Sequence, residues 1–224
     1  MTNEEMRRLL LEISARLDVI YRCEKHWAAR WRKGDKGMVL YPPAASTAID
    51  NLERSLGKAL PPQYRQFLSV TDGCEHFWDD FSFLGTEGKH SARVTAKILQ
   101  YIEGQRSEVK QDFGVVNKKT ISQWEAQNPR YMFLEQHLPI ATTFGGNVFL
   151  FDVRTEDASG EMGVVFWDLS WGAWDDRRDA NFAALLERTL KEVNERATKY
   201  KSRSSTRGVI KKAASKKQRD RKAR

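Results

Sequence analysis

The fold-determining stretch is IDNLERSLGKALPPQYRQFLSVTDG, residues 49–73. It predicts two short helices. Ile49, Leu52 and Leu56 recur at spacings of three and four, which places them on one face of a first helix. Gly57 follows, where a helix commonly ends because glycine accepts a left-handed backbone. The second helix is predicted to begin at a Pro-Pro pair and to end before an Asp-Gly pair. Its apolar and turn positions are Leu60, Pro61, Pro62, Tyr64, Phe67, Leu68, Asp72 and Gly73.

Length and composition predict one globular domain with extensions. The chain has 224 residues, of which 40% are hydrophobic and 30% charged, enough to bury a sizeable core. It has no apolar run of about 18 residues, so no membrane span is predicted. The charged N-terminus lacks a secretory pattern, which predicts a cytoplasmic protein. The two cysteines, Cys23 and Cys74, are too few for a disulfide framework and are expected to be reduced thiols.

The net charge of +8 is unevenly distributed along the chain. Residues 199–224 contain twelve Lys or Arg and one acid, a net charge of +11, whereas the other 198 residues hold 26 basic and 29 acidic side chains, a net of −3. The 199–224 segment is also poor in apolar residues and is predicted to be a disordered basic tail. Such a tail could make weak, salt-dependent contacts with nucleic acid, or simply keep the protein soluble.

The N-terminal residues predict one long amphipathic helix over residues 3–33. Its apolar seam consists of Met6, Leu10, Ile13, Leu17, Ile20, Trp27 and Trp31. The seam could dock on the domain, or it could pair with a second copy and form an oligomer. We therefore divide the chain into an N-terminal helical extension (1–40), a domain (46–198) and the basic tail (199–224).

The rest of the domain predicts an antiparallel sheet and a closing helix, and so an α+β fold. Strands are expected at 81–84, 138–141, 147–153 and 163–167. A helix within 91–112 is expected to break at Gly104, and a short one is expected around 121–124. Ser46 or Thr47 should cap the helix that begins the 49–73 stretch, and Asp179 should cap the closing helix. Residues 154–162 and the segment after Trp167 are predicted loops, and Trp167 itself is predicted to lie in the core.

Catalytic and metal sites find little support in the sequence. Zinc could take Cys23, His26, Cys74 and His76, but their spacing is loose for a zinc site. A Cys74–His76 nucleophilic pair has no oxyanion motif beside it. Phosphate-binding glycine loops, serine nucleophile elbows and metalloprotease motifs do not occur. We therefore predict no cofactor, no metal and no catalytic residue.

Two acidic-aromatic segments are the candidates for a partner surface, because aromatic side chains anchor interfaces and carboxylates steer basic partners. Alternatively, their tryptophans fill the core and their carboxylates are solvated loop charges. The candidate residues are Glu75, Trp78, Asp79 and Asp80 in the first segment and Trp171, Trp174, Asp175 and Asp176 in the second.

The quoted stretch resembles the start of the SUKH superfamily (Smi–Knr type). Its motif here is Leu52-Glu53, Gly57, then Leu-Pro-x-x-Tyr-x-x-Phe-Leu from Leu60, and a closing Asp-Gly. Two further matches follow in the family's order, at residues 138–152 and 163–186. The motif residues of the matches are Leu52, Leu56, Leu60, Pro61, Tyr64, Phe67, Leu68, Gly73, Pro139 and Gly145.

The resemblance implies function as well as fold. Proteins of this superfamily are non-enzymatic binding domains, among them bacterial immunity proteins against polymorphic toxins and fungal regulators of cell-wall synthesis. It therefore implies a protein partner, either a toxin domain such as a nuclease or the partner of an intracellular regulatory or scaffold protein. Neither the N-terminal helix nor the basic tail is covered by it.

Overall fold

Helices surround one antiparallel sheet. The computed structural model describes residues 1–23, 38–143 and 145–200, with the backbone alone at Asp79 and residues 174–176. The helices are α1 (Asn3–Cys23), α3 (Ser46–Leu56), α4 (Pro62–Val70), α5 (Gly88–Phe113), α6 (Lys118–Gln127) and a closing helix over residues 182–200, with 3-10 turns η1 (Trp78–Asp80), η2 (Leu134–Gln136) and η3 (Val153–Thr155). The strands are β1 (Val39–Leu40), β2 (Cys74–Phe77), β3 (Phe81–Phe83), β4 (Leu138–Thr142), β5 (Val148–Asp152), β6 (Gly163–Asp168) and β7 (Gly172–Asp179). The predicted α+β fold is confirmed.

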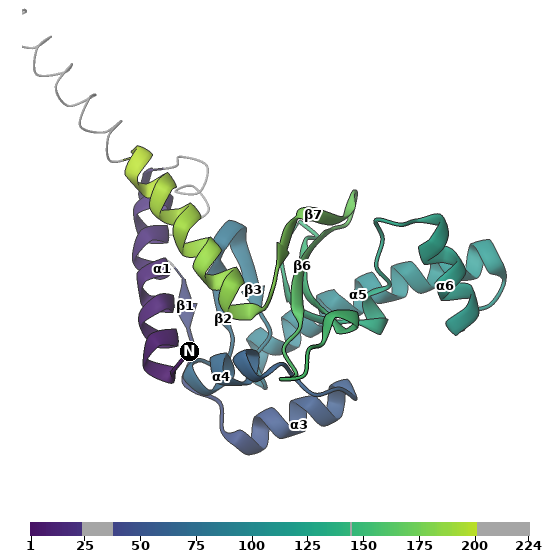
Figure 1. The fold of residues 1–224 in the computed structure, drawn as a ribbon, viewed down its shortest axis with the longest axis horizontal. Helices are drawn as coiled ribbons and strands as arrows, with labels where there is room; N and C mark the ends of the chain where they lie inside the picture. The colour runs from purple at the N-terminus through teal and green to yellow at the C-terminus, as the bar shows by residue number, and fades with distance from the viewer. Residues whose placement is uncertain (24–37, 144, 201–224) are drawn as a thin grey trace, which may run out of the picture.

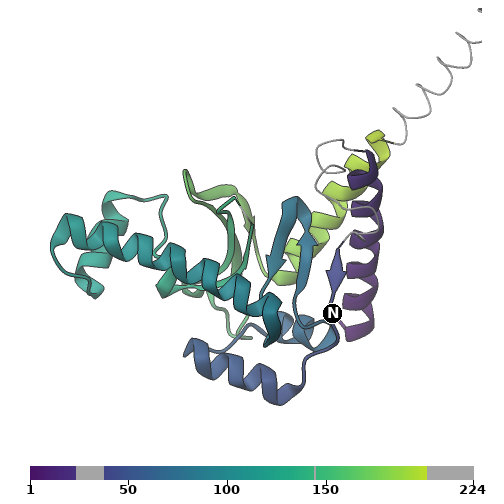
Figure 2. The same cartoon turned by 180° about the vertical axis from the view of Figure 1, so that it is seen from behind.

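The sheet is a meander whose spatial order, β1 to β7, is the order of the chain. Every neighbouring pair is antiparallel, with Leu138 opposite Phe151 and Val148 opposite Trp167 in the central strands. Figures 1 and 2 show α1 and the 182–200 helix side by side on one side of this sheet and α5 on the other. Both faces of the sheet are therefore covered, which explains why every side chain of β4 and β5 is buried.

The 49–73 stretch builds the main core, and both predicted helices are confirmed as α3 and α4. Gly57 ends α3 with a left-handed φ of 65°. Tyr64 of α4 is fully buried, and its ring lies 5.1 Å from that of Phe182 in the closing helix. The Tyr64 hydroxyl donates a 2.7 Å hydrogen bond to the carbonyl of Leu84. The helix is thus fixed both to the sheet and to the last helix.

A second, smaller core fills the opposite face of the sheet. Tyr101 of α5 packs there with Val148, Leu150, Val165 and Trp167. Trp167 is only 1% exposed, which confirms its predicted place in the core. The alternation along β5 and β6 therefore distributes apolar side chains between two cores.

The seam of α1 is docked within its own chain. Met6, Leu10, Ile13, Leu17 and Ile20 are each at most 1% exposed and belong to the main core. Of the two alternatives for this seam, docking is what the described residues show. The predicted continuation of the helix to residue 33, with Trp27 and Trp31, lies outside the described residues.

Three helix predictions were wrong. Gly104 does not break α5, which continues to Phe113 because Gly104 stands on an exposed face where it costs only propensity. Ala45 precedes α3 and no side chain caps that helix, so neither Ser46 nor Thr47 is the cap. Asp179 is not a cap either.

The residue at the start of the closing helix is Asn181, which accepts a 3.0 Å bond from the backbone N–H of Ala184. Asp179 instead ends β7 and holds the guanidinium of Arg188 through two 2.8 Å bonds. The segment predicted as a loop after Trp167 also differs, because most of it is strand β7. Finally, no described helix combines the length and apolar character that crossing a membrane would need.

Candidate functional site

A sharp turn after α4 directs the chain into β2. Gly73 has a φ of 79°, and a Cβ there would lie 2.7 Å from the Phe83 carbonyl oxygen, so only glycine fits. Asp72 beside it accepts hydrogen bonds from the backbone and the hydroxyl of Thr86. In β2 the side chains of Cys74 and Phe77 enter the main core. Glu75 points the other way, toward α5.

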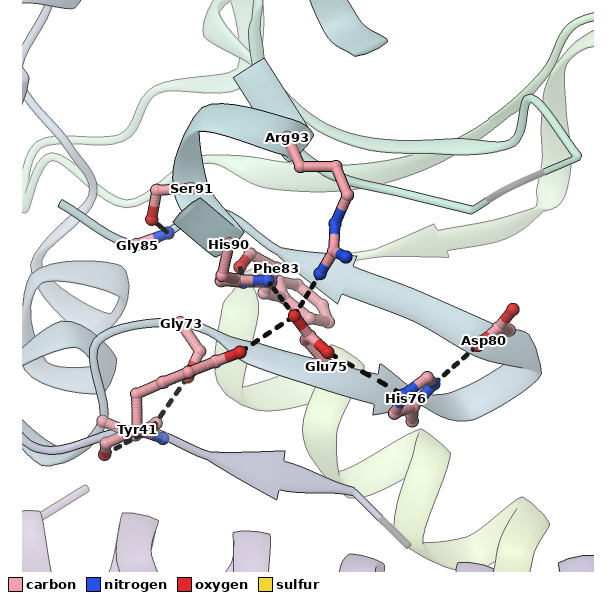
Figure 3. Close-up of polar contacts among 11 residues, drawn as sticks. Tyr41, Gly73, Glu75, His76, Asp80, Phe83, Gly85, His90, Ser91 and Arg93 are labelled. Carbon is pink, nitrogen blue, oxygen red and sulfur yellow. Dashed lines mark hydrogen bonds and ion pairs between the residues drawn. The ribbon is translucent and has the colours of Figure 1, made fainter. Parts of the chain in front are cut away.

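Glu75 is the centre of a polar network (Figure 3). Its Oε1 accepts a 2.8 Å hydrogen bond from the Tyr41 hydroxyl, lies 3.0 Å from Nδ1 of His90 and is paired with the guanidinium of Arg93. Its Oε2 lies 3.8 Å from Nε2 of His76. Segments far apart in sequence, including the one before α3 and the first turns of α5, thus meet on a single carboxylate.

The network fixes the charge of Glu75. Burial alone would raise its pKa, but the hydrogen bond from Tyr41 and the charges of Arg93 and His90 outweigh burial and hold the pKa of Glu75 below its usual value. Burial and the bond to Glu75 raise the pKa of Tyr41 to about 12. Glu75 is therefore an ionised acceptor at neutral pH, and Tyr41 is a donor.

His76 and Asp80 form the end of the β2–β3 hairpin. Both are non-glycine residues with left-handed backbones, φ 58° and 71°. Their side chains meet, with Nδ1 of His76 2.8 Å from Oδ1 of Asp80. Such backbones cost roughly 1–2 kcal/mol each and persist only where surrounding contacts hold them.

A groove of about 550 Å³ lies between this hairpin and α5. Its lining residues are Glu75, His76, Asp80 and Ser82 from the hairpin, Arg93, Val94, Ala96, Lys97 and Gln100 from α5, and Thr142 and Thr143 from the end of β4. The walls combine hydrogen-bonding groups with the apolar surface of Val94 and Ala96. Its size lies within the range of about 300–1,000 Å³ found for ligand pockets.

The meander brings the two acidic-aromatic segments to the same end of the sheet. In an antiparallel meander every second connection lies at the same end, and Ser82 opposite Thr142 and Val148 opposite Trp167 set this register. The β2–β3, β4–β5 and β6–β7 connections therefore lie at one end of the sheet, and the first two contribute Asp80 and Thr143 to the groove. The last carries two exposed apolar side chains, Leu169 (49% exposed) and Trp171 (65%).

The β4–β5 turn connects this tip with the groove. A Cβ at Gly146 would lie 3.2 Å from Leu169 Cδ2 and 3.3 Å from the Tyr101 hydroxyl, so these groups are neighbours. Lys97 lies over the Tyr101 ring, 5.4 Å from its centroid, and also lines the groove. We call the groove and the β6–β7 connection together the hairpin-end surface.

The structure places the eight candidate partner residues differently. Glu75 and Asp80 line the groove and Trp171 is exposed at the tip. Trp78 is only 8% exposed, with the guanidinium of Arg196 over its ring at 5.1 Å, so it offers little surface to a partner. The side chains of the remaining four are not described, and these are Asp79, Trp174, Asp175 and Asp176.

The motif residues lie mainly in the main core rather than on this surface. Leu60, Pro61, Tyr64, Phe67, Leu68, Gly73 and Pro139 are buried, Leu52 and Leu56 are half-buried, and Gly145 is exposed in the β4–β5 turn.

Sequence reasoning missed three partners of Glu75, namely Tyr41, His90 and Arg93. The only local signal was the spacing of His90 and Arg93, three residues apart at the start of a helix, which places them on one face. Nothing in the sequence connected that face to Glu75 or to Tyr41. Only the fold brings these side chains together.

The cysteine hypotheses gain no support from the geometry. Cys74 is fully buried, and burial raises the pKa of its thiol far above the ordinary value, so it is no ready nucleophile. Cys23 is exposed at the end of α1, and His26 lies outside the described residues. Within the described chain no three His, Cys, Asp or Glu side chains converge as metal ligands would.

A second buried charge cluster lies at the opposite end of the sheet. Asp152 is 3% exposed and holds the guanidinium of Arg154 through bonds of 2.8 and 2.9 Å. Nδ1 of His137 lies 3.4 Å from Asp152 but makes no hydrogen bond among the described residues. Burial lowers the pKa of His137 to about 4, despite the opposing charge of Asp152.

The sequence matches a known protein family. Residues 43–188 match the SMI1 / KNR4 family (SUKH-1). The chain belongs to this family. The match covers the domain from the segment before α3 to the first part of the closing helix, and it leaves α1 and residues 199–224 outside. Membership in the SMI1 / KNR4 family supports a non-enzymatic domain that works through protein–protein interaction. A search of curated proteins returned no match.

Proposed function

We propose that this SMI1 / KNR4 family chain is a cytoplasmic immunity protein that binds a cognate toxin domain and blocks its active site. Family membership supports a binding role. The hairpin-end surface supports a protein partner, because exposed aromatic side chains commonly anchor protein–protein interfaces. The single observation that carries the proposal is Trp171, which is 65% exposed in the β6–β7 connection.

A nuclease toxin is the partner class that this surface suits. Nuclease clefts are basic because they bind phosphates, and carboxylates that steer such a cleft raise the association rate. Outside the 199–224 segment the chain has a net charge of −3, and both acidic-aromatic segments lie at the hairpin end.

Co-expression with the toxin domain encoded beside this gene tests the proposal. We expect restored growth, a stable complex on size exclusion, and loss of toxin activity at a one-to-one ratio. If the toxin-expressing cells are not rescued and no complex forms, the immunity role is rejected. A complex with a cell-wall or other housekeeping protein instead would favour the regulatory alternative.

A matched pair of variants maps the surface. Trp171→Ala should weaken the complex at least tenfold, about 1.4 kcal/mol, if the side chain is an interface anchor. Val115→Ala removes a similarly exposed apolar side chain, 52% exposed, in the α5–α6 connection and should leave affinity unchanged. Equal affinities for the two variants would remove Trp171 from the interface.

Charge reversal tests electrostatic steering. Reversing Asp79, Asp80, Asp175 and Asp176 together should slow association, most strongly at low salt. An unchanged association rate would remove these residues from the site.

The basic tail supports a second candidate role in nucleic-acid association. Residues 199–224 have a net charge of +11, so any retention on nucleic acid should fall steeply with salt. Removing residues 201–224 should abolish retention at low salt. Retention unchanged by that deletion would exclude the role.

A further inference from the structure

The connection between β6 and β7 is a short turn, residues 168–172, whose backbone is held by its own aspartate. Oδ1 of Asp168 accepts hydrogen bonds from the backbone N–H groups of Ser170, at 2.8 Å, and Trp171, at 3.1 Å. Such an Asx turn fixes the backbone through a side chain. Gly172 then leads the chain into β7 with a φ of 74°, and a Cβ there would collide with the carbonyl oxygen of Arg130.

Residues 128–133, which join α6 to η2, support this β6–β7 turn from outside. The Tyr131 hydroxyl donates a 2.9 Å hydrogen bond to the carbonyl of Ser170. The backbone N–H of Ala173 donates to the carbonyl of Arg130. The Tyr131 ring also packs edge-on against Trp167 of β6, with centroids 6.4 Å apart. The turn is therefore bonded to a second segment of the chain as well as to Asp168.

Helix α5 fixes that second segment. Gln105 is 5% exposed, and its Nε2 donates a 2.8 Å hydrogen bond to the carbonyl of Met132. Its Oε1 accepts a 2.8 Å bond from the backbone N–H of Leu134. A buried amide bonded at both ends has one orientation, so it sets the backbone on the C-terminal side of Tyr131. Connected hydrogen bonds thus lead from α5 to the β6–β7 turn.

The turn presents side chains rather than backbone groups. The N–H groups of Ser170 and Trp171 and the carbonyl of Ser170 already have partners in the chain, so a binding protein gains little by bonding to them. The side chains of Trp171 and Leu169 are 65% and 49% exposed. Burial of a tryptophan removes a large apolar area from water, which makes it a strong interface anchor.

We infer that the β6–β7 turn is a preformed anchor that inserts Trp171 into an apolar pocket of the partner protein, with Asp168 and Tyr131 as positioning residues. The inference rests on the proposed function for the partner, and it adds the chemistry of the partner's pocket. A turn that already has its bound conformation loses less conformational entropy on binding. Removing either positioning group should therefore weaken the complex even though the Trp171 side chain is unchanged.

The charges of the turn favour a protein over a lipid surface. Residues 168–176 contain three aspartates and no lysine or arginine. Segments that insert aromatic side chains into membranes use neighbouring cations to attract anionic headgroups, which carboxylates would repel. A protein pocket with an apolar centre and a polar rim accommodates such carboxylates.

NMR relaxation of the free, full-length protein tests whether the turn is preformed. We expect the backbone amide of Trp171 to have an order parameter of about 0.8 or more, and Asp168→Ala to lower it to about 0.6 or less. Asp168→Asn keeps an acceptor oxygen and should retain the wild-type value. A mobile Trp171 amide in the wild-type protein, or no change in Asp168→Ala, would overturn the inference.

Affinity for the toxin domain encoded beside this gene tests the pocket. Trp171→Phe should keep the affinity within about fivefold, whereas Trp171→Gln, polar and of similar reach, should lose at least tenfold. Equal affinities for these two variants would show that the pocket is not apolar and would reject the inference.

The positioning residues are tested in the same complex. Asp168→Ala and Tyr131→Phe, which removes only the hydroxyl, should each weaken binding about threefold to tenfold. Combined with Trp171→Gln, Asp168→Ala should have little further effect, because the turn acts through the anchor. The matched control is Asp157→Ala, since Asp157 holds a similar turn in the β5–β6 connection through the N–H of Ser159 at 2.8 Å. It should leave the affinity unchanged, and a loss equal to that of Asp168→Ala would reject the positioning role.

Other occupants give different results. Sedimentation with phosphatidylcholine–phosphatidylserine vesicles that is lost in Trp171→Gln would make the turn a lipid anchor, against the inference. A dimer that is lost in the same variant would make the occupant a second copy, also against it. Toxin neutralisation with affinity unaffected by Trp171→Gln would reject only this inference. A complex with a different protein that tolerates Trp171→Phe but not Trp171→Gln, without toxin binding, would reject only the proposed function.

Discussion

Nδ1 of His90 lies 3.0 Å from Oε1 of Glu75, while its Nε2 lies 2.6 Å from the carbonyl oxygen of Phe83. Both ring nitrogens of His90 thus face oxygen atoms, and the carboxylate of Glu75 pairs with His90 and with Arg93. A buried ion pair of this kind is costly to break from one side, because the remaining charge then has no counterion. The pair fastens the start of α5 to the β2–β3 hairpin and so shapes the groove.

Glu75→Gln should lower the free energy of unfolding by about 1–3 kcal/mol at neutral pH, since it leaves Arg93 without a counterion and weakens the contacts with Tyr41 and His90. The pKa of Glu75 is depressed in the fold, so its stabilisation is present above the unfolded value of about 4.3 and is lost as pH falls through the folded value. Urea unfolding at several pH values should show that the difference in free energy of unfolding between the wild-type protein and Glu75→Gln becomes smaller in acid.

The control for that variant is Glu135→Gln, which breaks an exposed pair with Arg106 in which both side chains are over 40% exposed. Its cost should stay below about 1 kcal/mol. If the two substitutions cost the same, the Glu75 network adds no special stability.

Gly73→Ala and Gly104→Ala should change stability in opposite directions. At Gly73 the φ is positive and a Cβ would meet the Phe83 and Gly85 backbone at 2.7 and 2.9 Å, so we expect a loss of about 2 kcal/mol or more. Gly104 lies inside α5 with open space around it, so alanine should add about 0.5–1 kcal/mol. Thermal and urea unfolding measure both, and a stabilising Gly73→Ala would contradict the account of the turn before β2.

Neighbouring leucines of α1 test whether this helix is part of the fold. Leu10 is fully buried and Leu11 is 53% exposed. Leu10→Ala should cost about 2–5 kcal/mol through the lost contacts and the cavity, and Leu11→Ala about 0.5 kcal/mol or less. Similar effects on the urea midpoint would mean that α1 docks only weakly.

His137 should make the protein less stable as the solution is acidified. Its pKa is about 4 in the fold and about 6.5 when unfolded, so between these values the unfolded chain binds the additional proton. The stabilisation is present above about pH 6.5 and is lost as pH falls toward 4, by on the order of 2 kcal/mol. His137→Gln should flatten that part of the urea-stability profile, and an unaltered slope would mean that other groups cause it.

The sequence predicted helices and strands best where the boundary residues, such as Gly and Pro, agreed with the spacing of apolar residues. The helices from Ile49 to Gly73 and the strands of the 138–152 segment had both kinds of signal, and each was found. Strand β7 was missed because a register shift between Val165 and Trp167 in its pairing with β6 leaves no clean alternation to detect. Strand β2 was missed because its polar Glu75 and His76 face the groove rather than solvent. A strand whose polar side chains line a groove therefore resembles a loop in its sequence pattern.

The candidate surface was only partly predictable. Composition singled out Glu75, Asp80 and Trp171, but it could not tell exposed from buried tryptophan, and Trp78 is packed beneath Arg196. Nor could composition place two segments about ninety residues apart at one end of the sheet, since that depends on the order of strands. The pairing of strands that are far apart in sequence determines which residues meet at the candidate surface, and no local sequence pattern reveals that pairing.

The position of α1 has a consequence for synthesis of the protein on the ribosome. Chains are synthesised from their N-terminus, so α1 is made well before the 182–200 helix, beside which it lies (Figure 1). Leu9 of α1 and Leu190 of that helix line the same crevice between the two helices. The nascent chain therefore carries an incompletely covered amphipathic helix until the 182–200 helix has been made. Chaperones that bind exposed apolar helices should recognise it during that interval.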